Sequence, residues 1–207
     1  MKFILFIFPP IVVYCQEPAE NVFPLKDSVV YYESIIDIDS VQTPELFTRS
    51  KIWILSRFKS QKGALQAEDK ELGYLMINTF TTDVFTYGQI ENIPLTFSSE
   101  YWFDMKIYIK DEKVKIVVDN LRWIDNQAKI EMSILSYRSE YETESIQALE
   151  LARRKKKARE KVRKEFEKFE PKLMHEVRKS FSRVDSEIRS LISSFESSIV
   201  KKSESEF

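Results

Sequence analysis

Two aspartates and two tryptophans form the group of side chains best suited to bind a ligand: Trp102, Asp104, Asp119 and Trp123. We expect Asp104 to lie directly opposite Asp119 on a neighbouring strand, although facing like charges are unfavourable in a sheet. Carboxylates beside aromatic rings predict a ligand or cation site on an open sheet face. The alternative, which the pattern favours, is structural. Lys106 then neutralises the carboxylates and a C-terminal helix covers the rings, because large apolar surface is rarely left bare.

A predicted hairpin positions these four residues. Apolar and polar residues alternate through residues 101–110, and the alternation resumes through residues 113–118. A two-residue loop at residues 111–112 brings the apolar partners of both strands onto one face, which fixes the register. The same register places Trp102 opposite Leu121 on the other face.

The rest of the expected domain, residues 28–140, combines strands with one helix. Residues 28–39 are rich in Val, Ile and Tyr and alternate in polarity, which is typical of a half-buried strand. Residues 64–85 predict a strand, a turn and a longer strand, and residues 86–99 are interpreted as a loop. The order of elements indicates an α+β fold, an antiparallel sheet with helices packed on one face.

The first helix is expected at residues 43–60. Thr43 fits the N-cap and Pro44 fits the first helical position, while Gly63 ends the helix. Trp53 borders the apolar stripe of this helix. We therefore expect the Trp53 side chain to be buried between the helix and the sheet.

Residues 141–207 predict a long, charged helical tail that follows the domain. Its apolar residues recur at steps of three and four from Met174 and form a heptad stripe. An isolated helix gains little stability unless it buries such a stripe, so we expect the stripe to be covered. We expect Pro171 to divide an earlier helix from the one that carries the stripe. The stripe predicts docking on the domain, self-association or an unknown protein partner, through six residues: Val177, Phe181, Val184, Ile188, Leu191 and Phe195.

The basic stretch from Ala152 to Phe166 indicates a solvated helix. Glutamates interleave with its lysines and arginines, which is typical of a solvent-exposed helix face. The stretch has no aromatic residue for base stacking before Phe166, and the whole chain has a net charge of −1, so we predict no nucleic acid partner. Membrane contact is not favoured, because no hydrophobic face accompanies the basic residues.

The first residues predict export. Lys2 precedes an uncharged apolar run at residues 3–14, which is shorter than the ~20 residues that a membrane-spanning helix needs. We expect residues 1–15 to be a signal peptide that is cleaved after Cys15, and the mature chain to be periplasmic or secreted. A lipoprotein anchored at Cys15 is the alternative. Residues 16–27 are interpreted as a linker.

Other residue types give little support for catalysis. The chain has one histidine, His175, which sits in the charged tail and is better explained as a surface residue than as a base or a metal ligand. The only cysteine, Cys15, provides no zinc cluster, and three glycines exclude a glycine-rich phosphate loop. We predict no metal and no cofactor, and a non-enzymatic role is favoured.

Three segments carry a resemblance to a known family: VVYYESIIDIDSVQTPELFTRSKIWILSRFKS, ALQAEDKELGYLMINTF and FDMKIYIKDEKVKI. They resemble the secreted bacterial domain of unknown function with a TATA-binding-protein-like (TBP-like) fold. The resemblance covers roughly residues 28–126 and implies that fold. It implies no activity and no catalytic residue.

Together these patterns predict an exported, non-enzymatic interaction or structural module of the bacterial envelope. The alternative is an envelope small-ligand binder, or a hydrolase, that uses the acidic aromatic sheet face. A pocket with converging polar groups would favour the alternative, and a flat or helix-covered face would favour the module.

Overall fold

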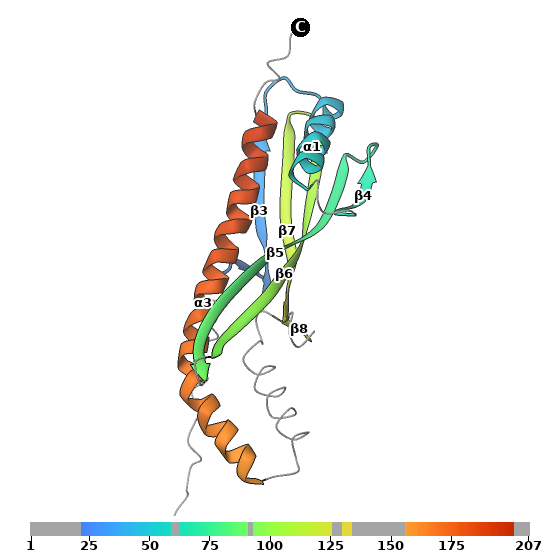
Figure 1. Cartoon of the computed structure of the whole chain (residues 1–207). Coiled ribbons are helices and arrows are strands. Elements are labelled where there is room, and N and C mark those ends of the chain that lie inside the picture. The colour runs from blue at the N-terminus through green and yellow to red at the C-terminus, as the bar shows by residue number, and fades with distance from the viewer. Residues whose placement is uncertain (1–21, 59–62, 91–92, 126–129, 134–155, 201–207) are drawn as a thin grey trace, which may run out of the picture.

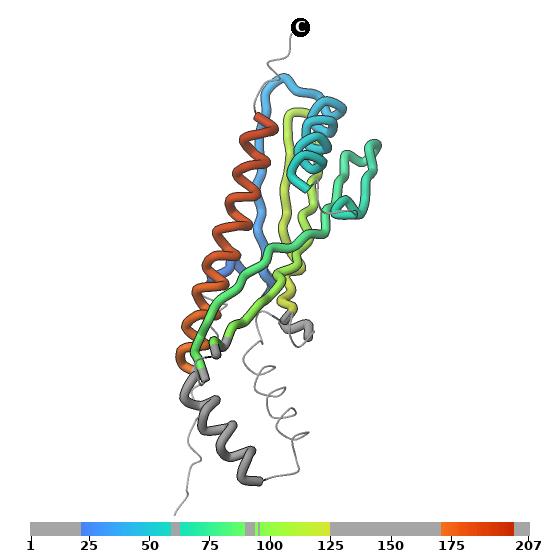
Figure 2. Tube along the Cα trace, in the orientation of Figure 1, coloured from blue at the N-terminus to red at the C-terminus, as the bar shows by residue number. Residues whose placement is uncertain are grey.

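Strands of alternating polarity pair into a main antiparallel sheet, and two helices pack on one of its faces (Figure 1). The computed structural model describes residues 22–58, 63–90, 93–125, 130–133 and 156–200 (Figure 1), and Figure 2 traces the Cα path of the chain in the same orientation. Its elements, in chain order, are β1 (Leu25–Lys26), β2 (Val29–Val30), β3 (Tyr32–Asp37), α1 (Thr43–Arg57), β4 (Leu65–Asp69), β5 (Tyr74–Ile90), β6 (Ile93–Lys110), β7 (Lys113–Asp125), β8 (Ile130–Ser133) and α3 (Lys156–Val200).

Six strands form the main sheet. Five follow the order β3-β7-β6-β5-β4, and β8 pairs with the part of β7 that extends past β3. β1 and β2 form a separate two-stranded sheet. The predicted α+β architecture, an antiparallel sheet with helices on one face, is therefore confirmed. The register of the β6–β7 hairpin is confirmed too, since Lys110 lies opposite Lys113 and Ile107 opposite Ile116.

A β-bulge interrupts this register after the two aspartates. Asp104 lies opposite Asp119, as predicted, but the next two residues of β7, Asn120 and Leu121, share the single partner position of Phe103. Asn120 has a φ of 55°, a left-handed conformation that Asn adopts more readily than most residues. The bulge therefore occurs where the sequence offers a residue that tolerates this backbone.

The bulge moves the later side chains of β7 to the opposite face, because alternation has a period of two residues. The predicted pairing of Trp102 with Leu121 is consequently wrong, and Trp102 lies opposite Arg122. Trp123 lies opposite Tyr101 and is buried in the core.

β5 and β6 form a longer hairpin than predicted. Residues 86–99, interpreted as a loop, pair as far as Ile90 and Ile93, with an irregularity between Thr86 and Gly88. Phe85 and Phe97 stack across the two strands, with ring centroids 5.4 Å apart. This buried aromatic pair outweighs the weak strand preference of the flanking polar and glycine residues.

α1 packs its predicted apolar face into the core, but its N-terminus differs from the prediction. Gln42, not Thr43, occupies the N-cap and makes no side-chain cap bond. Thr43 instead donates its backbone N–H and its hydroxyl to the carboxylate of Asp111, at 2.9 Å and 2.6 Å. The β6–β7 loop thus supplies an acceptor for an N–H at the start of α1, and these bonds lower the pKa of Asp111.

Trp53 is buried, as predicted, but its main aromatic contact is with α3. Its ring meets Phe195 edge to face at a centroid distance of 5.0 Å, and its indole N–H donates to the hydroxyl of Ser194 at 3.3 Å. Arg49, also on α1, donates to the carbonyl of Ile199 near the end of α3 at 2.8 Å. α1 and α3 therefore pack against each other as well as covering the sheet.

α3 continues through Pro171, so the predicted division of the helix at this residue is wrong. Its apolar stripe packs into the core that the sheet and α1 share. Phe181 contacts Tyr101 and Trp123 edge to face, with ring centroids 6.1 Å and 5.6 Å away. All six residues predicted to dock on a partner are buried there: Val177, Phe181, Val184, Ile188, Leu191 and Phe195.

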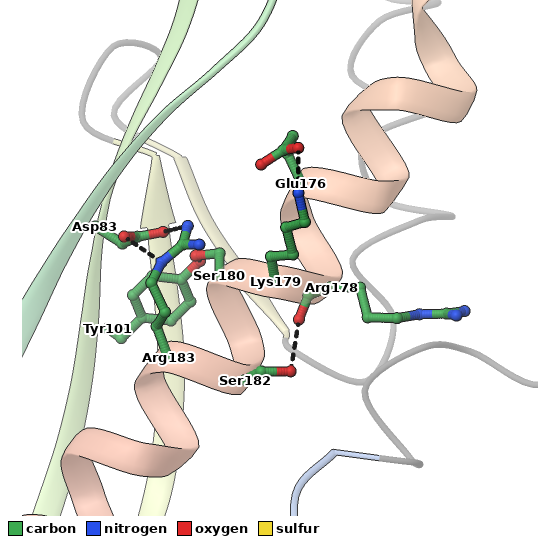
Figure 3. Close-up of polar contacts among 8 residues, drawn as sticks. All are labelled: Asp83, Tyr101, Glu176, Arg178, Lys179, Ser180, Ser182 and Arg183. Atoms are coloured by element: carbon green, nitrogen blue, oxygen red, sulfur yellow. Dashed lines mark hydrogen bonds and ion pairs between the residues drawn. The ribbon is translucent and has the colours of Figure 1, made fainter.

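Polar contacts fix the position of α3 on the sheet (Figure 3). The hydroxyls of Tyr101 and Ser180 lie 2.6 Å apart in a buried contact. Arg183 donates from Nε and from a terminal nitrogen to the two carboxylate oxygens of Asp83, at 2.9 Å and 2.6 Å. Arg178 points away from this cluster, so one side of α3 faces the sheet and the other faces away from it.

Other predictions concern residues near the ends of the chain. Phe23, within the expected linker at residues 16–27, is buried against Phe181, with ring centroids 5.5 Å apart. The expected signal peptide and Cys15 lie outside the described residues, as does the expected domain boundary near residue 140. The side chains of the basic stretch up to Phe166 also lie outside them. Neither described helix holds a stretch long and apolar enough to span a membrane.

We predict that Trp53→Ala lowers the free energy of unfolding by ~3–5 kcal/mol, because it removes a large ring from the α1–α3 contact. Leu55→Ala, on the exposed side of the same helix, should change it by less than ~0.5 kcal/mol. Urea melts followed by circular dichroism measure both values. Equal losses for the two variants would contradict the packing of α1 on α3.

We also predict that acid weakens the docking of α3. Burial raises the pKa of Asp83. Hydrogen bonds from Arg183 and Ser180 and the charge of Arg183 together lower this pKa by more than burial raises it, so the net shift is downward. A lowered pKa in the folded state stabilises the fold above the unfolded pKa of ~3.9, and this contribution disappears as the pH falls through the folded pKa.

Asp83→Asn should therefore reduce stability at pH 7 by about 1 kcal/mol and by much less near pH 2. Urea melts across this pH range provide the measurement, and Asp37→Asn, in an exposed ion pair with Lys113, is the matched control. A deficit for Asp83→Asn that is the same at both pH values would contradict the role of the Asp83 carboxylate.

Candidate functional site: the open face of the sheet

The face of the main sheet opposite α1 and α3, called the open face below, carries the candidate site. Alternation along four strands assigns side chains to it, since their neighbours in sequence point into the core. The open face comprises Glu33, Ile35 and Asp37 on β3; Lys113, Lys115, Val117 and Asp119 on β7; Trp102, Asp104, Lys106, Tyr108 and Lys110 on β6; and Tyr74, Met76, Asn78 and Phe80 on β5.

The two facing aspartates have separate partners, which resolves their repulsion. Asp104 is only 7% exposed and accepts hydrogen bonds from the amide nitrogens of Asn78 and Asn120, at 2.6 Å and 2.9 Å. Asp119 accepts both of its bonds from the ammonium of Lys106, at 2.7 Å and 2.8 Å. Neutral amides therefore hold one carboxylate and a cation holds the other.

The charge on Lys106 is stabilised by this contact. Burial lowers the pKa of Lys106. The hydrogen bond to Asp119 and the charge of Asp119 raise this pKa by more than burial lowers it, so the net shift is upward. The predicted neutralising role of Lys106 therefore applies to Asp119, while Asp104 depends on amide donors that the pairing pattern alone did not indicate.

The two predicted tryptophans lie on opposite faces of the sheet. Trp102 is on the open face, where its ring lies 4.7 Å from that of Phe80 and its indole N–H donates to Glu100 at 2.9 Å. Trp123 is in the core, where α3 covers it. The predicted site thus retains Trp102, Asp104 and Asp119, and the bulge removes Trp123 from it.

Aromatic pairs flank the aspartates along β5 and β6. Tyr74 lies opposite Tyr108, with ring centroids 5.2 Å apart, and Phe80 lies opposite Trp102. Asp104 and its partner Asn78 are between these pairs in the register. The open face therefore presents two aromatic pairs with polar side chains between them. Such a surface is suited to contact the flat body of a ligand.

A pocket of about 480 Å³ lies at the hairpin end of the open face, within the size range of small-molecule sites. Ile35 and Tyr108, which are 53% and 42% exposed, contribute apolar surface to it. Its lining is formed by Tyr31, Ile35, Lys106, Tyr108, Lys110, Lys113, Lys115, Val117 and Asp119. Of the predicted site residues only Asp119 belongs to this lining.

Sequence reasoning missed this pocket because it depends on the strand order. β3 is far from β6 and β7 in the sequence, yet it pairs with β7 and places Ile35 opposite Lys115. The alternation of apolar and polar residues in β3 was visible in the sequence. No local signal indicated which strand would lie beside it.

An ordered set of hydrogen bonds bounds the pocket on the β3 side. Tyr31 donates its hydroxyl to Glu33 at 2.6 Å, and this bond is the main reason that the pKa of Tyr31 is raised to about 12. Glu33 also pairs with Lys115 at 2.9 Å. The bonds from Tyr31 and Lys115 lower the pKa of Glu33, so this carboxylate stays charged.

The predicted histidine lies apart from this surface, since His175 is exposed on α3. Among the described residues, no three His, Cys, Asp or Glu side chains are grouped so that they could hold a metal ion.

Comparisons with known proteins concern the same part of the chain. Residues 32–124 match a family model described as "Domain of unknown function (DUF4468) with TBP-like fold". No curated protein matches the chain.

Two solved structures are similar at low identity. One is a DUF4468 family protein from Bacteroides ovatus, with 10% identity and a TM-score of 0.42 over 54% of this chain and 64% of that chain. The other is a TBP-like protein from Parabacteroides distasonis, with 13% identity and a TM-score of 0.41 over 53% of this chain and 69% of that chain. The match thus spans less than two thirds of the Bacteroides ovatus chain.

We predict that Lys106→Met destabilises the fold by about 1 kcal/mol, because it leaves Asp119 charged and facing Asp104. In an Asp119→Asn background the same substitution should cost less than half as much, since the repulsion is already gone. Urea melts of the four proteins form the double-mutant cycle. Equal costs in both backgrounds would contradict the proposed neutralisation.

Proposed function

Because residues 32–124 of this chain are a DUF4468 domain with a TBP-like fold, and that family's description assigns no activity, we propose a function from the geometry of the open face. The protein is an exported, non-enzymatic binding module of the bacterial envelope that holds a small ligand on this face. The observation that carries the proposal is the pocket at the hairpin end, where exposed Ile35 and Tyr108 adjoin a set of charged groups.

The position of α3 supports the open face over the tail as the binding surface. The apolar stripe of α3 is buried against the chain's own sheet, so its six predicted docking residues are already covered in this conformation. Exposed apolar side chains on the open face have no such cover from the two described helices. Among them, Ile35 and Tyr108 line the pocket, which supports the open face as the binding surface.

The bonding of the two aspartates favours binding over hydrolysis. A general acid or base has to reach its substrate with a free oxygen or proton. Asp104 is nearly buried and held by two amides, and Asp119 has both oxygens on Lys106. Asp119 lines the pocket, but its carboxylate is engaged by Lys106, so the acidic face is better suited to bind than to catalyse.

Export remains part of the proposal. Its support is the pattern of the first residues, with Lys2, the apolar run at residues 3–14 and the cleavage site after Cys15. The module would then act in the periplasm or outside the cell, or at a membrane surface if Cys15 is lipidated.

We expect small aromatic compounds to bind to the open face. Titration of ¹⁵N-labelled protein with indole and with indole acetate should shift amide resonances of β3, β6 and β7 and leave those of α1 unchanged. Tyr108→Ala should weaken binding by about two- to tenfold, because it removes the exposed ring from the pocket wall.

Leu55→Ala is the matched control, since it removes an exposed apolar side chain from α1 instead. The proposal fails if neither compound shifts resonances of the open face. It also fails if Leu55→Ala weakens binding as much as Tyr108→Ala does.

A further inference from the structure

Lysines gather at one end of the open face, although the chain as a whole has a net charge of −1. The strand register brings them together: Lys110 lies opposite Lys113, and Lys115 lies opposite Tyr108. Lys106 precedes Tyr108 by two residues in β6, so both side chains lie on the same face. Four lysines therefore line one pocket with Asp119, and three of them pair with carboxylates, Lys106 with Asp119, Lys113 with Asp37 and Lys115 with Glu33.

The pairing of Lys110 with Lys113 is unfavourable, and an ion pair within the fold offsets the charge of Lys113 alone. Like charges directly opposite each other destabilise a sheet. Lys113 has a partner in Asp37 at 3.0 Å, but Lys110 has no ion pair among the described residues. An anion bound between these two strands would relieve their repulsion.

The existing ion pairs do not prevent an anion from binding. Lys113 and Lys115 are 54% and 38% exposed and pair with Asp37 and Glu33. Exposed ion pairs contribute only about 0–1 kcal/mol, so their ammonium groups can turn toward a ligand at little cost. Each ammonium has three donors, and a carboxylate partner does not use all of them.

The surroundings of the lysines limit the size and shape of the anion. Glu33, Asp37 and Asp119 border the cluster, and they would repel an extended polyanion. Ile35 and Tyr108 provide exposed apolar surface within the same pocket. A compact acid with an apolar or aromatic body fits both conditions.

We propose that this pocket binds a small organic anion, whose carboxylate, sulfonate or phosphate group lies among Lys110, Lys113 and Lys115 and whose flat apolar body lies against Tyr108 and Ile35. The proposal rests on the proposed function and names its ligand class. The lysines supply selectivity for the anion, and the apolar wall supplies contact area.

Anilinonaphthalene sulfonate is a suitable probe, because the uncharged N-phenylnaphthylamine has the same aromatic body without the anion. Calorimetry or fluorescence titration should give one saturable site for the sulfonate, with about tenfold weaker binding of the neutral compound. Affinity for the sulfonate should fall as sodium chloride is raised, since salt screens exposed charges.

Two lysine variants test where the sulfonate binds. Lys110→Gln should weaken its binding about fivefold, and the double variant Lys110→Gln with Lys113→Gln should weaken it further. Lys51→Gln is the matched control, because Lys51 is an exposed lysine of α1 that pairs with Glu68 and does not line the pocket. Circular dichroism and urea midpoints verify that each variant is folded.

The possible failures of the two proposals are distinguishable. Equal binding of both compounds, unaffected by the lysine variants but weakened by Tyr108→Ala, would overturn the anion class and leave binding on the open face intact. Sulfonate binding that is unchanged in the lysine variants and in Tyr108→Ala would overturn both. Loss of binding in Lys51→Gln would overturn the location among the hairpin lysines.

Discussion

The burial of the apolar stripe of α3 against the sheet is the interaction on which the rest of the structure depends. Phe181 meets the rings of Tyr101 and Trp123, and Phe195 meets Trp53 of α1, so one helix connects the sheet with the other helix. This packing decides which face of the sheet is core. It leaves the opposite face free of both helices, and the candidate site lies on that face.

A single extra residue in β7 then determines the composition of the site. Because of the bulge at Asn120, the aromatic ring of Trp123 is added to the core under α3, while the amide of Asn120 reaches Asp104 on the open face. The same backbone irregularity therefore strengthens the core and supplies one of the two amides that stabilise a nearly buried carboxylate. Without it, Asp104 would face Asp119 with fewer neutral donors at hand.

The sequence predicted local features well and non-local ones poorly. Alternation between residues 101 and 118 was strong enough to fix the β6–β7 register, and the steps of three and four in α3 identified its buried residues. The bulge was not predictable, because Asn120 is an ordinary residue for a strand end or a turn and only pairing reveals the extra residue. The pocket was missed for a related reason, since pairing of β3 with β7 is a property of the whole sheet.

The contacts of α3 also set the order in which the fold can be completed. Ser194 bonds to Trp53, 141 residues earlier, and Asp185 bonds to Tyr32, 153 residues earlier. Closing such long segments costs chain entropy, and structures dominated by distant contacts fold slowly. Until α3 is in place, the rings of Tyr101 and Trp123 lie on an uncovered sheet. Such transiently exposed apolar surface makes a partly folded chain prone to aggregation.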